Sequence, residues 1–163
     1  MILPRATERL EAGQWGETPA DTVTLPYHER HHRRRRFKSD GGLEFMLDLA
    51  RAEALVAGDG LRLETGVIIL VRAAKEDLIS ITASSRALLM RCAYHLGNRH
   101  LPVQLDEERL LIQSDSVIAE MLTGLGARTE SVQSAFQPEG GAYASGGHHH
   151  HHDDDEHGHD HEH

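Results

Sequence analysis

The sequence predicts an α+β fold, in which a small all-β domain precedes a βαββαβ domain and a disordered, His-rich tail. Three observations support this order. Residues 22–74 are short strand-like runs separated by glycine-containing turns. From residue 77 onward, strand-like runs alternate with two segments of helical periodicity. Beyond residue 137 the sequence is rich in Gly, Ala, Ser, His and acidic residues, and such a composition buries too little apolar surface to fold.

The first domain, residues 1–74, is predicted to be built from strands. With 163 residues, of which 39% are hydrophobic, the chain has room for at most two compact domains. Runs rich in β-branched and aliphatic residues, with Gly-containing turns between them, are typical of a small all-β domain. The predicted strands are residues 22–27, 30–37, 43–50, 61–66 and 67–73.

Four consecutive arginines, residues 33–36, lie in the second of these runs. Neighbouring side chains of a strand point to opposite faces, so half of them could pair with carboxylates such as Glu44 and Asp48 across a hairpin. A solvated edge strand protected by charge is the simpler interpretation, and nucleic-acid binding is the alternative. The run has only Phe37 as a stacking aromatic and the chain carries a formal charge of −9, so we expect no nucleic-acid partner.

The second domain, residues 75–136, begins with a strand-like run at residues 78–83 and a helix. Ser84 or Ser85 would cap the start of that helix and Gly97 its end.

A hairpin, a second helix and a final strand follow at residues 103–114, 115–125 and 127–136. Ser114 or Asp115 would cap the second helix, and two glycines would stop it. The resulting βαββαβ order is the split arrangement of ferredoxin-like folds. A domain of about 60 residues has a small core, so pairing with a second copy would help to cover its apolar surface.

The histidines are concentrated at the C-terminus. Nine of the 14 lie in the last sixteen residues, together with six acidic residues and no Lys or Arg. An expression tag is one alternative, but five histidines followed by DDDEHGHDHEH are more typical of a native metal-binding tail. A flexible linker, residues 137–147, precedes this tail. The predicted tail ligands are His148, His149, His150, His151, His152, His157, His159, His161 and His163.

Several classes of protein are not expected. The single Cys excludes an internal disulfide framework and a multi-cysteine zinc site, and it fits a reducing compartment. The longest aliphatic run, residues 67–71, is far shorter than the roughly 20 residues that span a bilayer, so we expect a cytoplasmic protein without a membrane partner. No HExxH motif, nucleophile–base arrangement or phosphate-binding glycine loop is present, so we do not expect an enzyme.

The segment YHLGNRHLPVQ, residues 94–104, contains the histidines of the second domain. His95 lies on the predicted helix, whereas His100 follows it and is expected to be exposed. One imidazole is an inadequate transition-metal site. On a two-fold axis, however, it becomes two ligands, and a His-rich tail could supply others. An ordinary structural histidine remains the alternative at this point.

Four features of the chain resemble the UreE family of urease accessory proteins, which are nickel metallochaperones. They are the HLGNRHLPVQ string, the small β domain with its Arg-rich strand, the AGDGL turn at residues 57–61 and the His-rich C-terminus. The resemblance covers the chain from about residue 22 to the end. It implies an N-terminal β domain of a partner- or peptide-binding type, followed by a ferredoxin-like domain that dimerises. It also implies that His100 binds nickel at the dimer interface and that the C-terminal histidines bind more.

The resemblance implies a homodimer that hands Ni²⁺ to the urease apoenzyme together with other accessory proteins, one of them a GTPase. The ligand types alone would also admit Zn²⁺, Cu²⁺ or Co²⁺. The competing hypothesis is a metal buffer or storage protein that acts through its tail.

The chain departs from the family pattern in one place. Some members carry a further pair of histidines after the hairpin, where this chain has Leu110, Ile112 and Ser114. We therefore expect no second metal site there. His28, His31 and His32 match no family motif, and we interpret them as structural.

Overall fold

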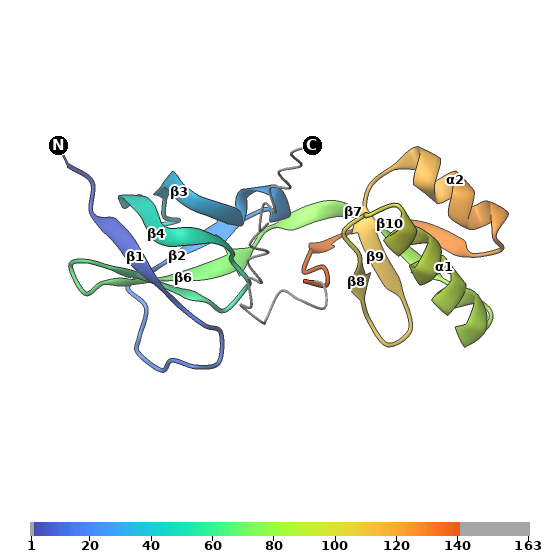
Figure 1. The fold of residues 1–163 in the computed structure, drawn as a ribbon, viewed down its shortest axis with the longest axis horizontal. Helices are drawn as coiled ribbons and strands as arrows, with labels where there is room; N and C mark the ends of the chain where they lie inside the picture. The colour runs from blue at the N-terminus through green and yellow to red at the C-terminus, as the bar shows by residue number, and fades with distance from the viewer. Residues whose placement is uncertain (1, 141–163) are drawn as a thin grey trace, which may run out of the picture.

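The computed structural model describes residues 2–140 and contains two β-sheets that follow one another along an elongated molecule (Figure 1). The first sheet has six strands, and the second has four strands and carries both helices. A mixed α+β fold, as predicted, is confirmed. The predicted disordered tail and most of its linker, residues 141–163, lie outside the described residues.

The first sheet has the strand order β2-β6-β5-β1-β4-β3. Strands β1 and β4, and likewise β2 and β6, pair in parallel, whereas the other neighbours are antiparallel. All five strands predicted for residues 22–73 are present. The six strands are β1 (Arg5–Leu10), β2 (Asp21–Leu25), β3 (His31–Lys38), β4 (Glu44–Ala54), β5 (Gly60–Leu63) and β6 (Ile68–Ala73).

Strand β1 was not predicted, although it lies in the middle of the sheet between β4 and β5. Its sequence, RATERL, has three charged residues, and only Ala6 is buried. The charges are accommodated because each finds a partner on a neighbouring segment. Arg5 pairs with Asp48 and Glu64, and Glu8 pairs with Arg62. Tertiary pairing thus overrides a weak local strand signal.

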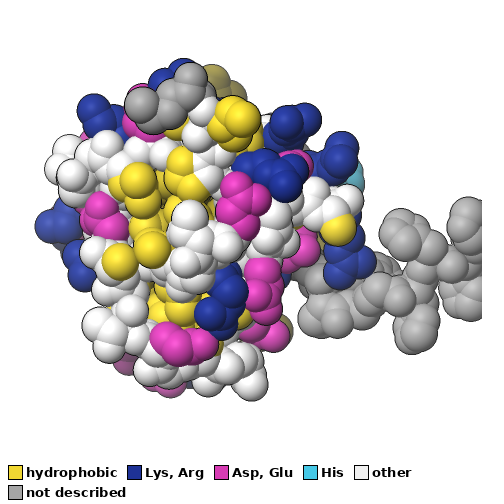
Figure 2. All heavy atoms as spheres, turned by 90° about the vertical axis from the view of Figure 1, so that its left-hand side faces the viewer, with side chains coloured by type: hydrophobic (Ala, Val, Ile, Leu, Met, Phe, Trp, Pro, Cys, Tyr) yellow, Lys and Arg dark blue, Asp and Glu magenta, His cyan; other side chains and the backbone are white. Residues whose placement is uncertain are grey.

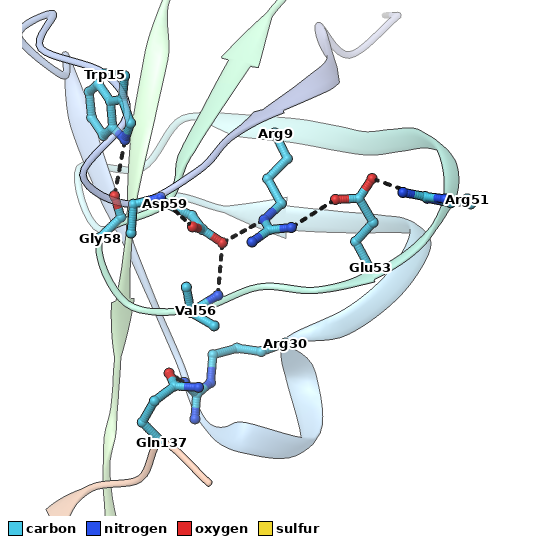
Figure 3. A network of polar contacts seen from close by, with 10 residues as sticks. Arg9, Trp15, Arg30, Arg51, Glu53, Val56, Gly58, Asp59 and Gln137 are labelled. Atoms are coloured by element: carbon cyan, nitrogen blue, oxygen red, sulfur yellow. Dashed lines mark hydrogen bonds and ion pairs between the residues drawn. The ribbon is translucent and has the colours of Figure 1, made fainter. Parts of the chain in front are cut away.

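The other charged side chain of β1, that of Arg9, meets the most buried carboxylate of the first sheet, Asp59 (Figure 3). Asp59 has no exposed surface. It accepts hydrogen bonds from Arg9 Nε at 2.7 Å and from the backbone N–H groups of Ala12 and Val56 at 2.9 Å each. A buried charge is tolerated when its lone pairs are satisfied in this way, so Asp59 ties β1 to the turn before β5.

The residues on either side of Asp59 explain the AGDG motif. Trp15 Nε1 donates to the carbonyl of Gly58 at 3.1 Å. A Cβ atom at Gly60 would lie 3.1 Å from the Trp15 ring and from Ile68. Glycine at position 60 therefore leaves room for the indole to pack against the start of β5.

The arginine run on β3 is paired with carboxylates, as predicted. In the antiparallel β3–β4 register, Arg36 bonds Glu44 at 2.9 Å, and Arg34 lies 3.9 Å from Asp48. Figure 2 shows Lys and Arg side chains interspersed with Asp and Glu around a hydrophobic patch on this end of the molecule. Such a mixed surface is typical of a protein edge strand and not of a phosphate-binding groove.

The second sheet has the antiparallel order β10-β7-β9-β8. Along the chain its elements follow the predicted βαββαβ order. They are β7 (Lys75–Thr82), α1 (Arg86–Asn98), β8 (Gln104–Leu105), β9 (Leu110–Gln113), α2 (Ser116–Gly124) and β10 (Arg128–Ala135).

Both helices pack on one face of this sheet. Cys92 and Leu96 of α1 share a buried core with Ile118 and Leu122 of α2 and with strand residues such as Ile81. The side chains of Ser85 and Asp115 each accept a backbone N–H of the first helical turn, which settles both predicted N-caps.

Phe136, the residue after β10, covers the opposite face of the second sheet. It is fully buried against Leu78 and Leu111. Its ring also meets Tyr27, in the short 3₁₀ helix η1 (Tyr27–Glu29) of the first domain, edge-on at 5.5 Å between centroids. Among the described residues, no helix has the length and apolar character needed to cross a membrane.

Replacing Asp59 by Ala should destabilise the first sheet. The change leaves the Arg9 guanidinium and two backbone N–H groups without their acceptor, so we expect the free energy of unfolding to fall by about 3 kcal/mol. Urea unfolding followed by the fluorescence of Trp15, the single tryptophan, measures this. As a control, Glu8→Ala breaks an exposed pair with Arg62 and should cost less than about 1 kcal/mol. Equal losses in the two variants would contradict a special role for Asp59.

Candidate metal-binding site

His100 lies immediately beyond the end of α1. The last helical residue is Asn98, and Arg99 is the C-cap. His100 has a φ of 56°, and it is the one non-glycine residue with positive φ among residues 2–140. Its side chain is exposed, as predicted.

Two hydrogen bonds close this end of the helix. The N–H of His100 donates to the carbonyl of Gly97 at 3.0 Å, and that of Leu101 donates to the carbonyl of Leu96 at 3.4 Å. This is a Schellman motif, in which the residue after the cap is left-handed and the next residue packs back on the helix. Leu96 is fully buried, and Leu101 packs against the same core. The burial of these two leucines therefore fixes the backbone of His100.

The prediction that Gly97 caps α1 is wrong. Gly97 lies inside the last helical turn, and His100 occupies the left-handed position that glycine usually takes. In α2 the same motif does use glycine. There Gly126 has a φ of 99°, and the N–H of Ala127 donates to the carbonyl of Leu122. An L-residue in this conformation costs about 1 kcal/mol relative to glycine, so His100 occupies a position for which the backbone prefers glycine.

The surroundings of His100 do not complete a metal site within one chain. Across residues 2–140, no group of three or more His, Cys, Asp or Glu side chains is placed to hold a metal ion. His95 is half-buried and contacts Tyr94 edge-on at 5.6 Å between ring centroids. Cys92 has no exposed surface, and burial raises the pKa of its thiol, which disfavours the thiolate needed for ligation. A metal site at His100 would therefore need ligands from elsewhere.

The C-terminal segment of the described chain runs past the loop that follows His100. The N–H of Gln137 donates to Gln104 Oε1 at 2.8 Å, and the N–H of Glu139 donates to the carbonyl of Val103 at 2.9 Å. Val103 and Gln104 belong to the HLPVQ string, but no spacing in the sequence indicates that they receive these bonds. From Glu139 to the first tail histidine is nine residues, a reach of up to about 30 Å.

All nine predicted tail ligands, from His148 to His163, lie outside the described residues.

The histidines of the first domain lie around the start of β3. His28 and His31 are exposed, whereas His32 is half-buried and its Nε2 accepts from Arg35 Nη1 at 3.1 Å. Burial, and next the positive charge of Arg35, lower the pKa of His32 below its usual 6.5. His31 and His28 act in the same direction, and Glu29 opposes them.

Replacing His100 by Gly should remove the imidazole without damaging the fold. We expect the free energy of unfolding to stay equal or rise by up to about 1 kcal/mol, because glycine adopts the left-handed conformation without strain. Gly126→Ala is the matched control, and it should lose about 1 kcal/mol at the equivalent position of α2. Urea unfolding followed by far-UV circular dichroism measures both. A large loss of stability in His100→Gly would contradict this account of the helix end.

The stability of the first domain should fall with acid partly through His32. Its folded-state pKa is lowered, so the unfolded chain binds the proton more readily, and stability is lost as pH falls through 6.5 and below. His32→Gln should weaken this dependence between pH 7 and pH 5, as measured by Trp15 fluorescence in urea. His28→Gln, whose side chain is 72% exposed and is the smallest of the named influences on the pKa of His32, should weaken it far less. Identical pH profiles for all three proteins would rule out a contribution from His32.

Comparison with known proteins places both halves of the chain in one family. The model for the N-terminal domain of the UreE urease accessory protein matches residues 3–74, and the model for its C-terminal domain matches residues 76–163. The proteins of this family are accessory proteins and not enzymes.

Individual relatives agree with the family models. The chain is 49% identical to the urease accessory protein UreE of Rhodopseudomonas palustris strain BisB18 over 140 residues, which cover 86% of this chain and 66% of the relative. It is 46% identical to that of Beijerinckia indica subsp. indica, covering 88% of this chain and 83% of the relative. With the protein from Cereibacter sphaeroides it shares 41% identity over 159 residues, 98% of this chain and 81% of the relative. This chain therefore belongs to the UreE family of urease accessory proteins.

Proposed function

We propose that this chain is a nickel metallochaperone that delivers Ni²⁺ to the urease apoenzyme during assembly of the enzyme's active site. Membership of the UreE family supports a role in urease maturation. One observation supports metal carriage in particular. The exposed imidazole of His100 lies on a fixed helix end, close to the start of a linker that leads to nine more histidines.

The donor set suits a carrier. Neutral imidazoles bind Ni²⁺ and also Zn²⁺, Cu²⁺ and Co²⁺, which are expected to compete. Because each imidazole is a separate ligand, one can dissociate while the others hold the ion. A recipient protein can therefore take the metal stepwise through mixed coordination. The tail raises the local concentration of ligands around His100.

A homodimer would complete the site. On the outward side of α1, Met90 is 67% exposed and Tyr94 is 66% exposed, with the exposed Ala87 on the same face. In this proposal a second copy covers that face across a two-fold axis, so that one His100 from each protomer contributes to a shared site. Tail histidines of either protomer supply the remaining ligands.

In this proposal each part of the chain has its own role. Residues 1–74 form the partner- or peptide-binding domain, residues 75–136 the metal-binding and dimerisation domain, and residues 137–163 the linker and metal-binding tail. The partners are the urease apoenzyme and other accessory proteins, including a GTPase, in the cytoplasm.

A metal buffer or storage protein is the second candidate. It is favoured by the concentration of nine of the 14 histidines in the tail. In a storage protein the tail would bind most of the metal ions, and His100 would contribute little to metal binding. In a chaperone His100 would bind the metal ion that is to be delivered, even when the tail is absent.

Nickel titration by calorimetry separates these hypotheses. A chain ending at Gly147 should keep one tight site per dimer, and His100→Gly in that chain should weaken the site at least tenfold, because its central ligand is lost. His95→Gln, which removes the other imidazole of the segment, is the matched control and should leave the site intact. Survival of the tight site in His100→Gly would overturn the assignment of His100.

A urease activation assay distinguishes delivery from storage. Co-expressed with urease and its accessory proteins, the chain ending at Gly147 should retain part of the activation, and His100→Gly should reduce it further. Complete loss on tail removal, with no effect of His100→Gly, would favour storage.

A further inference from the structure

We propose that Arg30, in the first domain, is a positioning residue for the metal-binding tail. It holds the tail root, residues 136–139, against the loop that follows His100. This inference rests on the proposed function, because it concerns how the tail is presented to the His100 site.

Arg30 grips the tail root directly. It lies between η1 and β3 and is 2% exposed. Its Nη1 donates to Gln137 Oε1 at 2.9 Å, and its Nη2 donates to the carbonyl of Phe136. Figure 3 shows the guanidinium of Arg30 beside the side chain of Gln137. One planar side chain thus binds two consecutive residues at the point where the chain leaves β10.

The opposite side of the tail root is held by the second domain. Gln137 and Glu139 donate their backbone N–H groups to Gln104 and Val103, three to four residues after His100. The root is therefore sandwiched between Arg30 and the loop that continues from the candidate metal ligand.

Glu76 and Tyr27 also lie near Arg30. Glu76 accepts from the N–H of Tyr27 at 2.9 Å and from Gln113 Nε2 at 3.3 Å. Burial lowers the pKa of Arg30, and the carboxylate of Glu76 opposes this by favouring the charged guanidinium, which also lies 5.8 Å from the centre of the Tyr27 ring. Contacts from both domains therefore fix where the guanidinium points.

The surroundings of the Arg30 side chain are not optimised for stability. Arg30 Nε is the one buried side-chain nitrogen or oxygen, among those the structure describes, that has no hydrogen-bond partner. An unsatisfied buried donor costs about 1–3 kcal/mol, and apolar residues often replace buried charges without loss. Arg30 carries this energetic cost and still donates two hydrogen bonds to the tail root, which fits a role in positioning the tail.

The consequence is a defined starting point for the tail. With the root held, the chain has nine residues from Glu139 to the first tail histidine, His148. If residues 137–139 detach while Phe136 stays buried, the tether starts at Phe136 and grows by three residues, and it no longer leaves from the loop after His100. The longer tether lowers the effective ligand concentration at His100 by about 1.5- to twofold.

The test compares the tail's contribution to nickel affinity in wild type and in Arg30→Met. That contribution is the ratio of the Kd of the chain ending at Gly147 to that of the full chain, measured by competition with a chelator of known affinity. Among residues 2–140, every buried core residue lies at or before Phe136, so the shorter chain keeps all three described cores. Arg30→Met should lower the ratio about 1.5- to twofold. It should leave the Kd of the shorter chain unchanged.

Two further variants keep the test decisive. Gln137→Ala removes one acceptor of the fork at an exposed position, so it should fold and lower the ratio in the same direction. Arg35→Met, five residues further along the chain and paired with Glu29 at 3.3 Å, is the control and should leave the ratio unchanged. Amide hydrogen exchange at Gln137 and Glu139 should accelerate in the first two variants only.

The outcomes separate this inference from the proposed function. Equal weakening of the full and shorter chains by Arg30→Met, or unchanged exchange at Gln137 and Glu139, would overturn the positioning role. Retention of the tight site in His100→Gly would instead overturn the proposed function, and the exchange measurement would still report on the root.

Discussion

The burial of Phe136 is the contact on which the arrangement of the molecule depends. Its ring fills the face of the second sheet that the helices leave open, and it meets Tyr27 from the first domain. The same residue offers its carbonyl to Arg30. One aromatic side chain therefore closes a core, joins the two domains and fixes the point from which the His-rich segment departs. Without it, the second sheet would expose Leu78 and Leu111, and the two domains would be linked mainly through the β6–β7 connection.

The two domains accommodate charged side chains in different ways. In the first, charged residues enter the middle of a sheet because each has a partner, and Asp59 is held by three donors with no exposed surface. In the second, the core of sheet and helices is apolar, and Ser85 and Asp115 cap the two helices. The first domain is consequently held together in part by specific ion pairs. In the second domain, the candidate metal ligand, His100, lies beyond the end of a helix.

Local signals were sufficient for most of the fold. Strand-like runs between glycine-containing turns identified the strands of residues 22–73, and hydroxyl and carboxylate caps located both helices. Strand β1 was missed because its stability comes from partners distant in the sequence. The end of α1 was misplaced because glycine is the usual signal, whereas burial of Leu101 imposed the left-handed turn on His100. Of the candidate site, the exposure of His100 was predictable from its place after a helix. The bonds that bring residues 137 and 139 beside Val103 and Gln104 were not, since no local pattern encodes them.

The way α1 ends also has an electrostatic consequence. The peptide dipoles of a helix sum to about half a negative charge at its C-terminus, carried by the last carbonyl groups. Helix α1 is 13 residues long, and His100 is the second residue beyond it. A cation near the helix end typically gains about 0.3–1 kcal/mol from this field when the site is exposed. The backbone of α1 itself thus favours a positive ion where the imidazole projects, before any second ligand arrives.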